Sequence, residues 1–121
     1  MIIVLVEHSA GAIPKSSLSA IRAALELKSS LGISSVTGLL LGASGTAAAA
    51  GEVTGYGLDS VVSVESDDLE KYLATSYEAA VMQVVEELDA TVFVAASSSV
   101  GKDLSPRVAQ KMDAAQAASI F

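Results

Sequence analysis

The sequence predicts an α/β fold, a three-layer, open and mainly parallel sheet with helices on both faces. Short β-rich runs alternate with longer segments of helical period, which is the pattern of βαβ units around a parallel sheet. The first run, Ile2 to Val6, is continuously apolar, as expected for a strand that is covered on both faces. The 121 residues are expected to form one domain, whose hydrophobic core stabilises the fold by a limited margin.

The first strand should lead into a long helix. After a turn at Ser9 to Gly11, Ser16 or Ser17 can cap this helix. Gly32 should end it. Between cap and end, spacings of three and four residues separate Leu18, Ile21, Leu25 and Lys28.

The second strand is expected at Val36 to Leu41. It ends in Gly42-Ala43-Ser44-Gly45, which lacks the third glycine and the acidic partner of a dinucleotide fingerprint and therefore predicts only a strand-to-helix turn. The alanines at Ala47 to Ala50 predict a short helix, which Gly55 and Gly57 should break.

The second half of the chain repeats the alternation. Ser60 to Val64 should be the third strand and Thr91 to Ala95 the fourth, with helices at about Thr75 to Leu88 and Asp103 to Met112. An acidic group after the third strand is expected to be a solvated helix start that the helix dipole favours. This group consists of Glu65, Asp67, Asp68 and Glu70. The buried stripe of the following helix should consist of Val81, Val84, Val85 and Leu88.

The start of the last helix carries the most informative motif, Gly101 to Ala109. Asp103 is expected to be the N-cap, which places Pro106 in the first turn, where a missing N–H costs nothing. Leu104, Val108 and Met112 share one face and should pack on the sheet. The segment from Ala96 to Asp103 also has the frame of a phosphate-binding loop, but an acid where the loop needs a hydroxyl would repel phosphate.

The tail from Ala114 to Phe121 is alanine-rich. It has no polar cap or charged run of the kind that usually closes a domain. This composition suggests that the chain has been cut and that the sheet is incomplete at its C-terminus.

Charge and residue usage exclude several kinds of site. Seven basic and fourteen acidic side chains give a net charge of −7, which opposes the phosphate neutralisation that nucleic-acid binding requires. There is no cysteine, so disulfides and thiolate sites are excluded, and with His8 as the single histidine no metal site is expected. No apolar run approaches the roughly 20 residues of a spanning helix, so no direct membrane insertion is expected.

Polar side chains follow the first and fourth strands. Because the ends of parallel strands converge, Glu7 and His8 are expected near Ser97 to Ser99. The group could act as an acid/base pair or a Ser–His–acid triad, although no nucleophile elbow accompanies it, and the alternative is a surface or interface role. Arg107 and Lys102 could bind a partner's carboxylate or carbonyls, or be solvated.

Several of these residues resemble the N-terminal region of the alpha subunit of electron transfer flavoproteins, over nearly the whole chain. The element Gly101-Lys102-Asp103-Leu104-Ser105-Pro106-Arg107-Val108-Ala109 is the most specific part of this resemblance. Its other parts are Glu7-His8, Lys15-Ser16, Ala47 to Ala50, Tyr72-Leu73-Ala74 with Tyr77, Met112-Asp113, Gln116 and Ile120. Ser119 departs from the family, which usually has Asp there.

The resemblance implies a fold like that of the adenine nucleotide alpha hydrolases and a subunit that pairs with a beta subunit. The complex would carry FAD as an electron shuttle between acyl-CoA or other dehydrogenases and a quinone oxidoreductase, in the mitochondrial matrix or the bacterial cytoplasm. The subunit would be an electron carrier rather than a catalyst on its own. In this family FAD belongs mainly to a C-terminal domain, so residues 1–121 would be a fragment of the N-terminal domain that holds no flavin.

For this chain the resemblance implies a platform role in the subunit interface and no catalytic residue. The interface candidates are Glu7, His8, Ser97, Ser98, Ser99, Lys102 and Arg107. The alternatives are a free-standing nucleotide-binding domain, similar to adenine-nucleotide-binding stress proteins, and a hydrolase acting through Ser97 to Ser99 and His8.

Overall fold

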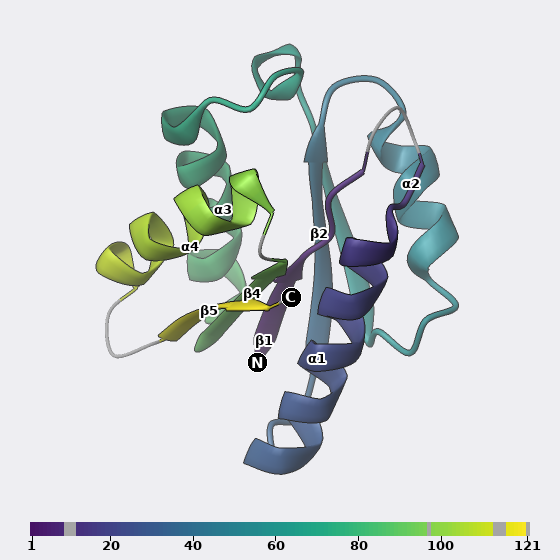
Figure 1. Cartoon of the computed structure of the whole chain (residues 1–121), viewed down its shortest axis with the longest axis vertical. Coiled ribbons are helices and arrows are strands. Elements are labelled where there is room, and N and C mark those ends of the chain that lie inside the picture. Colours follow the sequence, from purple (N-terminus) through teal and green to yellow (C-terminus); the bar gives the residue numbers. More distant parts are fainter. Residues whose placement is uncertain (9–11, 97, 113–115, 121) are drawn as a thin grey trace.

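The computed structural model describes residues 1–8, 12–96, 98–112 and 116–120 (Figure 1). In this described part five strands form one sheet in the order β3-β2-β1-β4-β5, and each neighbouring pair is parallel. The strands are β1 (Ile2–Leu5), β2 (Val36–Gly42), β3 (Ser60–Glu65), β4 (Val92–Ala96) and β5 (Gln116–Ile120). The expected mainly parallel α/β sheet is confirmed.

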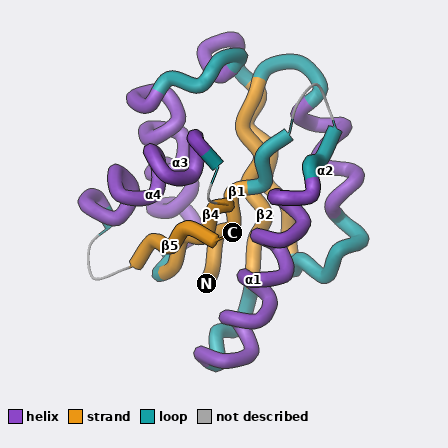
Figure 2. The backbone as a smooth tube through the Cα atoms, viewed as in Figure 1, coloured by secondary structure: helices purple, strands orange, loops and turns teal. Residues whose placement is uncertain are grey.

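Helices cover both faces of the sheet (Figures 1 and 2). They are α1 (Lys15–Leu31), α2 (Thr46–Val53), α3 (Ala74–Leu88) and α4 (Ser99–Lys111), with a 3-10 turn, η1 (Asp67–Leu69), ahead of α3. No described helix is both long and apolar enough to cross a bilayer.

The two faces of the sheet carry two separate cores. Alternate residues of a strand point to opposite faces, so Ile2 and Val4 pack with α1 and α2, whereas Ile3 and Leu5 pack with α3 and α4. The predicted stripes are confirmed: Val81, Val84 and Val85 of α3 are buried, and so are Leu104, Val108 and Met112 of α4. Only Leu88 of these stripes is half-buried. The inner strands β1 and β4 are apolar throughout because helices cover them on both sides.

The strand order reverses direction at one point. From β1 the chain moves through α1 and α2 to β2 and β3, and then returns through α3 to place β4 on the other side of β1. The connections after β1 and after β4 therefore diverge toward opposite faces. In doubly wound sheets this switch point opens a crevice at the carboxyl ends of the strands.

The predicted cap of α1 is wrong. Pro14, in an extended conformation, is the N-cap, and its carbonyl accepts the N–H of Ser17 at 3.1 Å. The Ser17 hydroxyl instead donates to the Glu7 carbonyl at 2.7 Å, which ties the helix to the end of β1. Gly32 ends α1 in the left-handed conformation, as expected.

The predicted start of α4 is wrong by about one turn. Ser98 is the N-cap, and its hydroxyl accepts the N–H of Gly101 at 3.1 Å, so Asp103 lies inside the helix. A Cβ on Gly101 would lie 1.7 Å from the Ala96 carbonyl oxygen, so only glycine fits where α4 passes the end of β4. Gly101 thus belongs to the first turn of the helix and not to a loop before it.

Pro106 lies in the interior of α4 rather than in its first turn. It has no N–H to donate to the carbonyl of Lys102, and proline inside a helix usually costs about 3 kcal/mol. Leu104 and Val108, on either side of it, are fully buried. Tertiary packing on the sheet therefore holds the helix together despite the proline.

The alanine-rich tail, for which the sequence predicted no strand, forms β5 and pairs with β4 from Val92↔Gln116 to Ala96↔Ile120. The acidic residues are not the start of α3; they lie on β3, η1 and the segment before Ala74. Helix α2 ends at Val53, with Thr54 as its C-cap directly before Gly55, as expected from the glycines. The predicted turn at 9–11, Ser97 and Asp113 lie outside the described residues.

Candidate functional site

A hydrogen bond spans the switch point between β1 and β4. The Ser98 hydroxyl donates to the Glu7 carboxylate at 2.6 Å while it accepts the Gly101 N–H. Glu7 follows β1 and Ser98 follows β4, so their pairing joins the two strand ends from which the connections diverge. The expectation that these residues lie close together is confirmed.

Glu7 ties two helices to the end of β1. Its carboxylate binds the start of α4 through Ser98, and its backbone carbonyl accepts the Ser17 hydroxyl of α1. Its negative charge also adds to the effect of burial in raising the pKa of Tyr77 on α3. The residue expected to be half of an acid/base pair is thus an anchor between strands and helices.

Among the described residues, His8 forms no serine triad. Its ring lies toward β2 and α2, because a Cβ on Gly42 would come within 2.8 Å of His8 Nε2 and 2.6 Å of Thr46 Oγ1. Both ring nitrogens are buried without a hydrogen-bond partner among the described residues. A triad would need the imidazole between the serine and the carboxylate, whereas here Ser98 and Glu7 bond each other directly.

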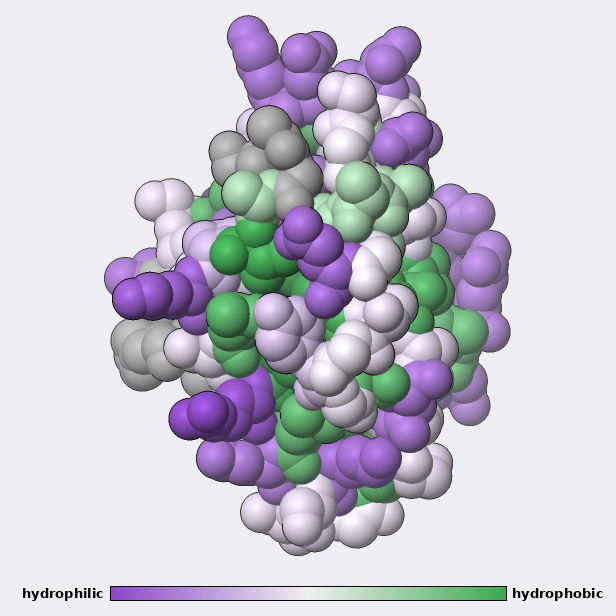
Figure 3. All heavy atoms as spheres, turned by 90° about the vertical axis from the view of Figure 1, so that its right-hand side faces the viewer, coloured by the Kyte–Doolittle hydropathy of each residue, from purple (hydrophilic) through white to green (hydrophobic). Residues whose placement is uncertain are grey.

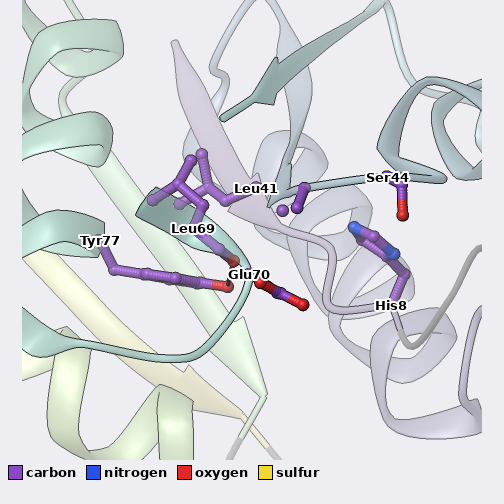
Figure 4. A pocket seen from close by; sticks show the side chains of 8 residues that line it. His8, Leu41, Ser44, Leu69, Glu70 and Tyr77 are labelled. Carbon is purple, nitrogen blue, oxygen red and sulfur yellow. Dashed lines mark hydrogen bonds between the residues drawn. The ribbon is translucent and has the colours of Figure 1, made fainter. Parts of the chain in front are cut away.

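A pocket of about 280 Å³ lies beside His8, at the carboxyl ends of β1 and β2 (Figure 4). It is lined by His8, Leu41, Gly42, Ala43, Ser44, Leu69, Glu70 and Tyr77. The turn before α2 provides one wall, with Gly45 in the left-handed conformation as its N-cap, and η1 and α3 provide the opposite wall. The predicted strand-to-helix turn at Gly42 to Gly45 is therefore confirmed and borders the pocket.

A second polar group lies between α3 and α4. Tyr72 donates to Asp103 Oδ2 at 2.5 Å, and the same oxygen pairs with Arg107 Nε at 3.4 Å. The Tyr72 ring stacks edge-on against Tyr77, with centroids 4.9 Å apart, and Tyr77 donates to the Leu69 carbonyl at 3.0 Å. These contacts connect the exposed surface of α4 to the wall of the pocket.

The electrostatics of this group follow from its contacts. Burial, followed by the hydrogen bond to the Asp103 carboxylate, raises the pKa of Tyr72, because both disfavour a phenolate. The Tyr72 hydroxyl, with a smaller contribution from the Arg107 guanidinium, holds the pKa of Asp103 below its usual value. Tyr72 is therefore neutral and Asp103 ionised over a wide pH range.

The other candidates from the sequence lie on α4. Ser99 and Lys102 are exposed, and Arg107 retains 45% of its side-chain accessibility beside Asp103. Their interface role stays a prediction. Sequence reasoning missed Glu70, Gly42 and Tyr77 as neighbours of His8, since only the strand order places the ends of β1, β2 and η1 together.

The described residues contain no group of three His, Asp or Glu side chains that could hold a metal ion. The carboxylates of the site are separated, since Glu7 faces Ser98, Asp103 faces Tyr72 and Glu70 lies in the pocket.

A comparison with known protein families identifies the family of this chain. The sequence profile of the electron transfer flavoprotein domain matches residues 2–121. The chain therefore belongs to the electron transfer flavoprotein family, whose function is electron transport. A search among curated proteins found no match.

The residues at the described strand ends do not suit the diphosphate of a flavin dinucleotide. The crevice at the switch point is spanned by the Glu7–Ser98 bond, and a phosphate there would face the Glu7 carboxylate. The hydroxyl at the α4 N-terminus is already used as the cap. The neighbouring pocket contains the Glu70 carboxylate, which would repel a diphosphate, and its volume of about 280 Å³ lies at the lower end of the roughly 300–1,000 Å³ of small-molecule sites.

Proposed function

We propose that this chain is the N-terminal part of an electron transfer flavoprotein alpha subunit and serves as a platform on which a beta subunit assembles. The complex carries FAD, in a C-terminal domain of the alpha subunit, and moves electrons from acyl-CoA or other dehydrogenases to an acceptor oxidoreductase. The chain itself is a scaffold within an electron carrier rather than a catalyst.

One observation carries this proposal. The switch-point crevice, where doubly wound domains usually take ligands, is bridged by Glu7 and Ser98. A domain that closes this crevice with its own side chains supports assembly better than it supports cofactor binding. The segment from Gly101 to Ala109 resembles the alpha subunit, and this resemblance favours alpha rather than beta as the subunit to which the chain belongs.

The structure suggests which surface of α4 could meet the partner. Arg107 uses its Nε on Asp103, and as a planar fork it has further N–H donors directed away from that atom. Lys102 is exposed on the same helix. Because an exposed i,i+4 ion pair contributes only about 0.3–0.5 kcal/mol to stability, Arg107 can be replaced without unfolding the domain.

The test uses a full-length alpha subunit that contains this sequence, co-expressed with its beta subunit. Arg107→Ala should reduce recovery of the flavin-containing complex, whereas Arg22→Ala should not, because Arg22 is an exposed arginine on α1. If Arg107→Ala leaves both subunit assembly and flavin retention unchanged, the interface role of Arg107 is wrong.

A second measurement tests the platform role itself. The purified 121-residue chain should contain no flavin, because the proposed FAD site lies in another domain. A stoichiometric yellow chromophore with flavin absorbance would contradict this assignment. A rise in melting temperature with adenine nucleotides would instead favour the free-standing nucleotide-binding domain.

A further inference from the structure

We propose that the pocket beside His8 binds the guanidinium group of an arginine side chain from a protein partner. The pocket lies between the turn before α2 on one side and η1 and α3 on the other. In Figure 4 the His8 ring and the Glu70 side chain extend into this space from different elements, with Ser44 beside the ring. The chemistry of the pocket does not depend on the subunit role proposed above.

The polar groups of the pocket are mostly hydrogen-bond acceptors. Tyr77 spends its hydroxyl hydrogen on the Leu69 carbonyl, so its oxygen offers only lone pairs to the pocket. The Glu70 carboxylate is exposed and has no ion-pair partner among the described residues. A ligand that satisfies these groups must supply N–H or O–H donors.

The ring of His8 adds an aromatic surface to the pocket. Both of its nitrogens are buried without a partner in the described part of the chain, so they offer almost no surface to a ligand. The contact that His8 offers is the face of its ring, on which a planar guanidinium can stack.

The surrounding charge favours a cation. The chain has a net charge of −7, and the residues from β3 to the start of α3 include four acids. These acids, Glu65, Asp67, Asp68 and Glu70, form no ion pair within the described ranges, and Lys71 is the only cation among residues 65–71. Figure 3 shows hydrophilic side chains gathered at the upper end of the molecule, the end that carries η1 in Figure 1.

Size and shape distinguish a side chain from a whole ligand. The pocket has about 280 Å³, close to the lower end of the range of roughly 300–1,000 Å³ for small-molecule sites, which suits a single side chain. Leu41 and Leu69 give it an apolar floor on which the methylene stem of a long side chain can pack. Arginine fits better than lysine, because a planar guanidinium donates to several acceptors at once and stacks on aromatic rings.

The experiment is an NMR titration of the ¹⁵N-labelled chain with the tripeptide acetyl-Gly-Arg-Gly-amide at low salt. The backbone signals of Gly42 and Ser44 and the imidazole nitrogens of His8 should shift, with a Kd of about 1 mM or weaker for one side chain. The matched peptide with citrulline, which is neutral, should leave these signals in place. The corresponding lysine peptide should bind more weakly than the arginine peptide.

Two carboxylate variants separate the pocket from the general acidity of this surface. Glu70→Gln should weaken arginine-peptide binding by about tenfold, because it removes a charge-assisted hydrogen bond. Asp67→Asn removes the same charge from η1, outside the pocket, and should change the affinity by less than about twofold. Equal shifts with arginine and citrulline peptides, or equal losses in the two variants, would overturn the proposal.

Discussion

The carboxylate of Glu7 accepts a hydrogen bond from the hydroxyl of Ser98, which lies 91 residues further along the chain, at 2.6 Å. The contact occurs at the single place where the sheet changes its winding direction, between β1 and β4. Ser98 also caps α4, so one side chain both starts a helix and joins two strands. The stability of this edge should therefore depend on Ser98 more than on its neighbours.

Replacing Ser98 tests this dependence. Ser98→Ala removes the N-cap of α4 and the bond to Glu7, and we expect a loss of about 1–2 kcal/mol in the free energy of unfolding. Ser99→Ala is the matched control, because Ser99 is exposed in the first turn of α4 and should change stability by less than about 0.5 kcal/mol. Urea unfolding followed by circular dichroism measures both. Equal midpoints for the two variants would contradict the double role of Ser98.

Gly101 gives a sharper test of the α4 start. Gly101→Ala would place a Cβ 1.7 Å from the Ala96 carbonyl oxygen, so α4 or β4 must shift, and we expect a destabilisation above about 3 kcal/mol. The control is Gly51→Ala in α2, where a Cβ meets nothing within 4 Å. This second variant should stabilise the protein by about 0.5–1 kcal/mol through helix propensity. Opposite shifts in melting temperature are expected, and shifts in the same direction would refute the close approach at Gly101.

The burial of Tyr72, together with its bond to Asp103, should make stability fall at alkaline pH. The folded pKa of Tyr72 is raised above the unfolded value of 10.0, so the contribution is fully present below pH 10.0 and is lost as pH rises through the folded pKa. Tyr72→Phe should lower the free energy of unfolding by about 1 kcal/mol at neutral pH. It should also remove one late-titrating phenol from the ultraviolet titration. Tyr56→Phe is the control, because Tyr56 lies exposed on the loop after α2. An identical alkaline loss in wild type and Tyr72→Phe would exclude Tyr72 as its source.

Asp59 should give the opposite pH dependence of stability, with a loss at acidic pH. Its carboxylate accepts the Val36 N–H at 2.8 Å and pairs with Lys28 at 3.0 Å, and these contacts lower its pKa from 3.8. The contribution is therefore present above pH 3.8 and is lost as pH falls through the lower folded pKa.

The test compares Asp59→Asn with wild type between about pH 6 and about pH 2. The variant should be less stable at the upper end, with the difference shrinking at the lower end. Glu52→Gln removes an exposed carboxylate of α2 that forms no ion pair in the described part and should keep the wild-type pH profile. A difference between Asp59→Asn and wild type that does not change with pH would argue against the lowered pKa.

Much of the fold could be predicted from the sequence because its signals are local. Continuous apolar runs gave β1, β2 and β4, and helical spacing gave the buried faces of α3 and α4, including Leu104 and Val108. The helix starts were predicted less well. Ser17 and Asp103 have side chains suited to capping, but tertiary contacts use them elsewhere, Ser17 on Glu7 and Asp103 on Tyr72.

The candidate site was predictable only in part. Convergence of parallel strand ends correctly placed Glu7 beside Ser98. The same reasoning placed His8 with the serines, whereas the ring lies against Gly42, because consecutive residues at a strand end point to opposite sides. The alanine-rich tail carried no strand signal of its own, and its pairing with β4 depends on an edge that only the folded sheet provides.

The strand order also bears on how the chain can fold during synthesis. Strands β1, β2 and β3 are consecutive neighbours, so this half of the sheet and its two covering helices can assemble before β4 has been made. Until β4 arrives, the other edge of β1, with Ile2, Ile3 and Val4, has no partner strand. The nascent chain must therefore keep an apolar strand edge open from the synthesis of β1 until that of β4, and in this interval the edge is exposed to aggregation or to a chaperone.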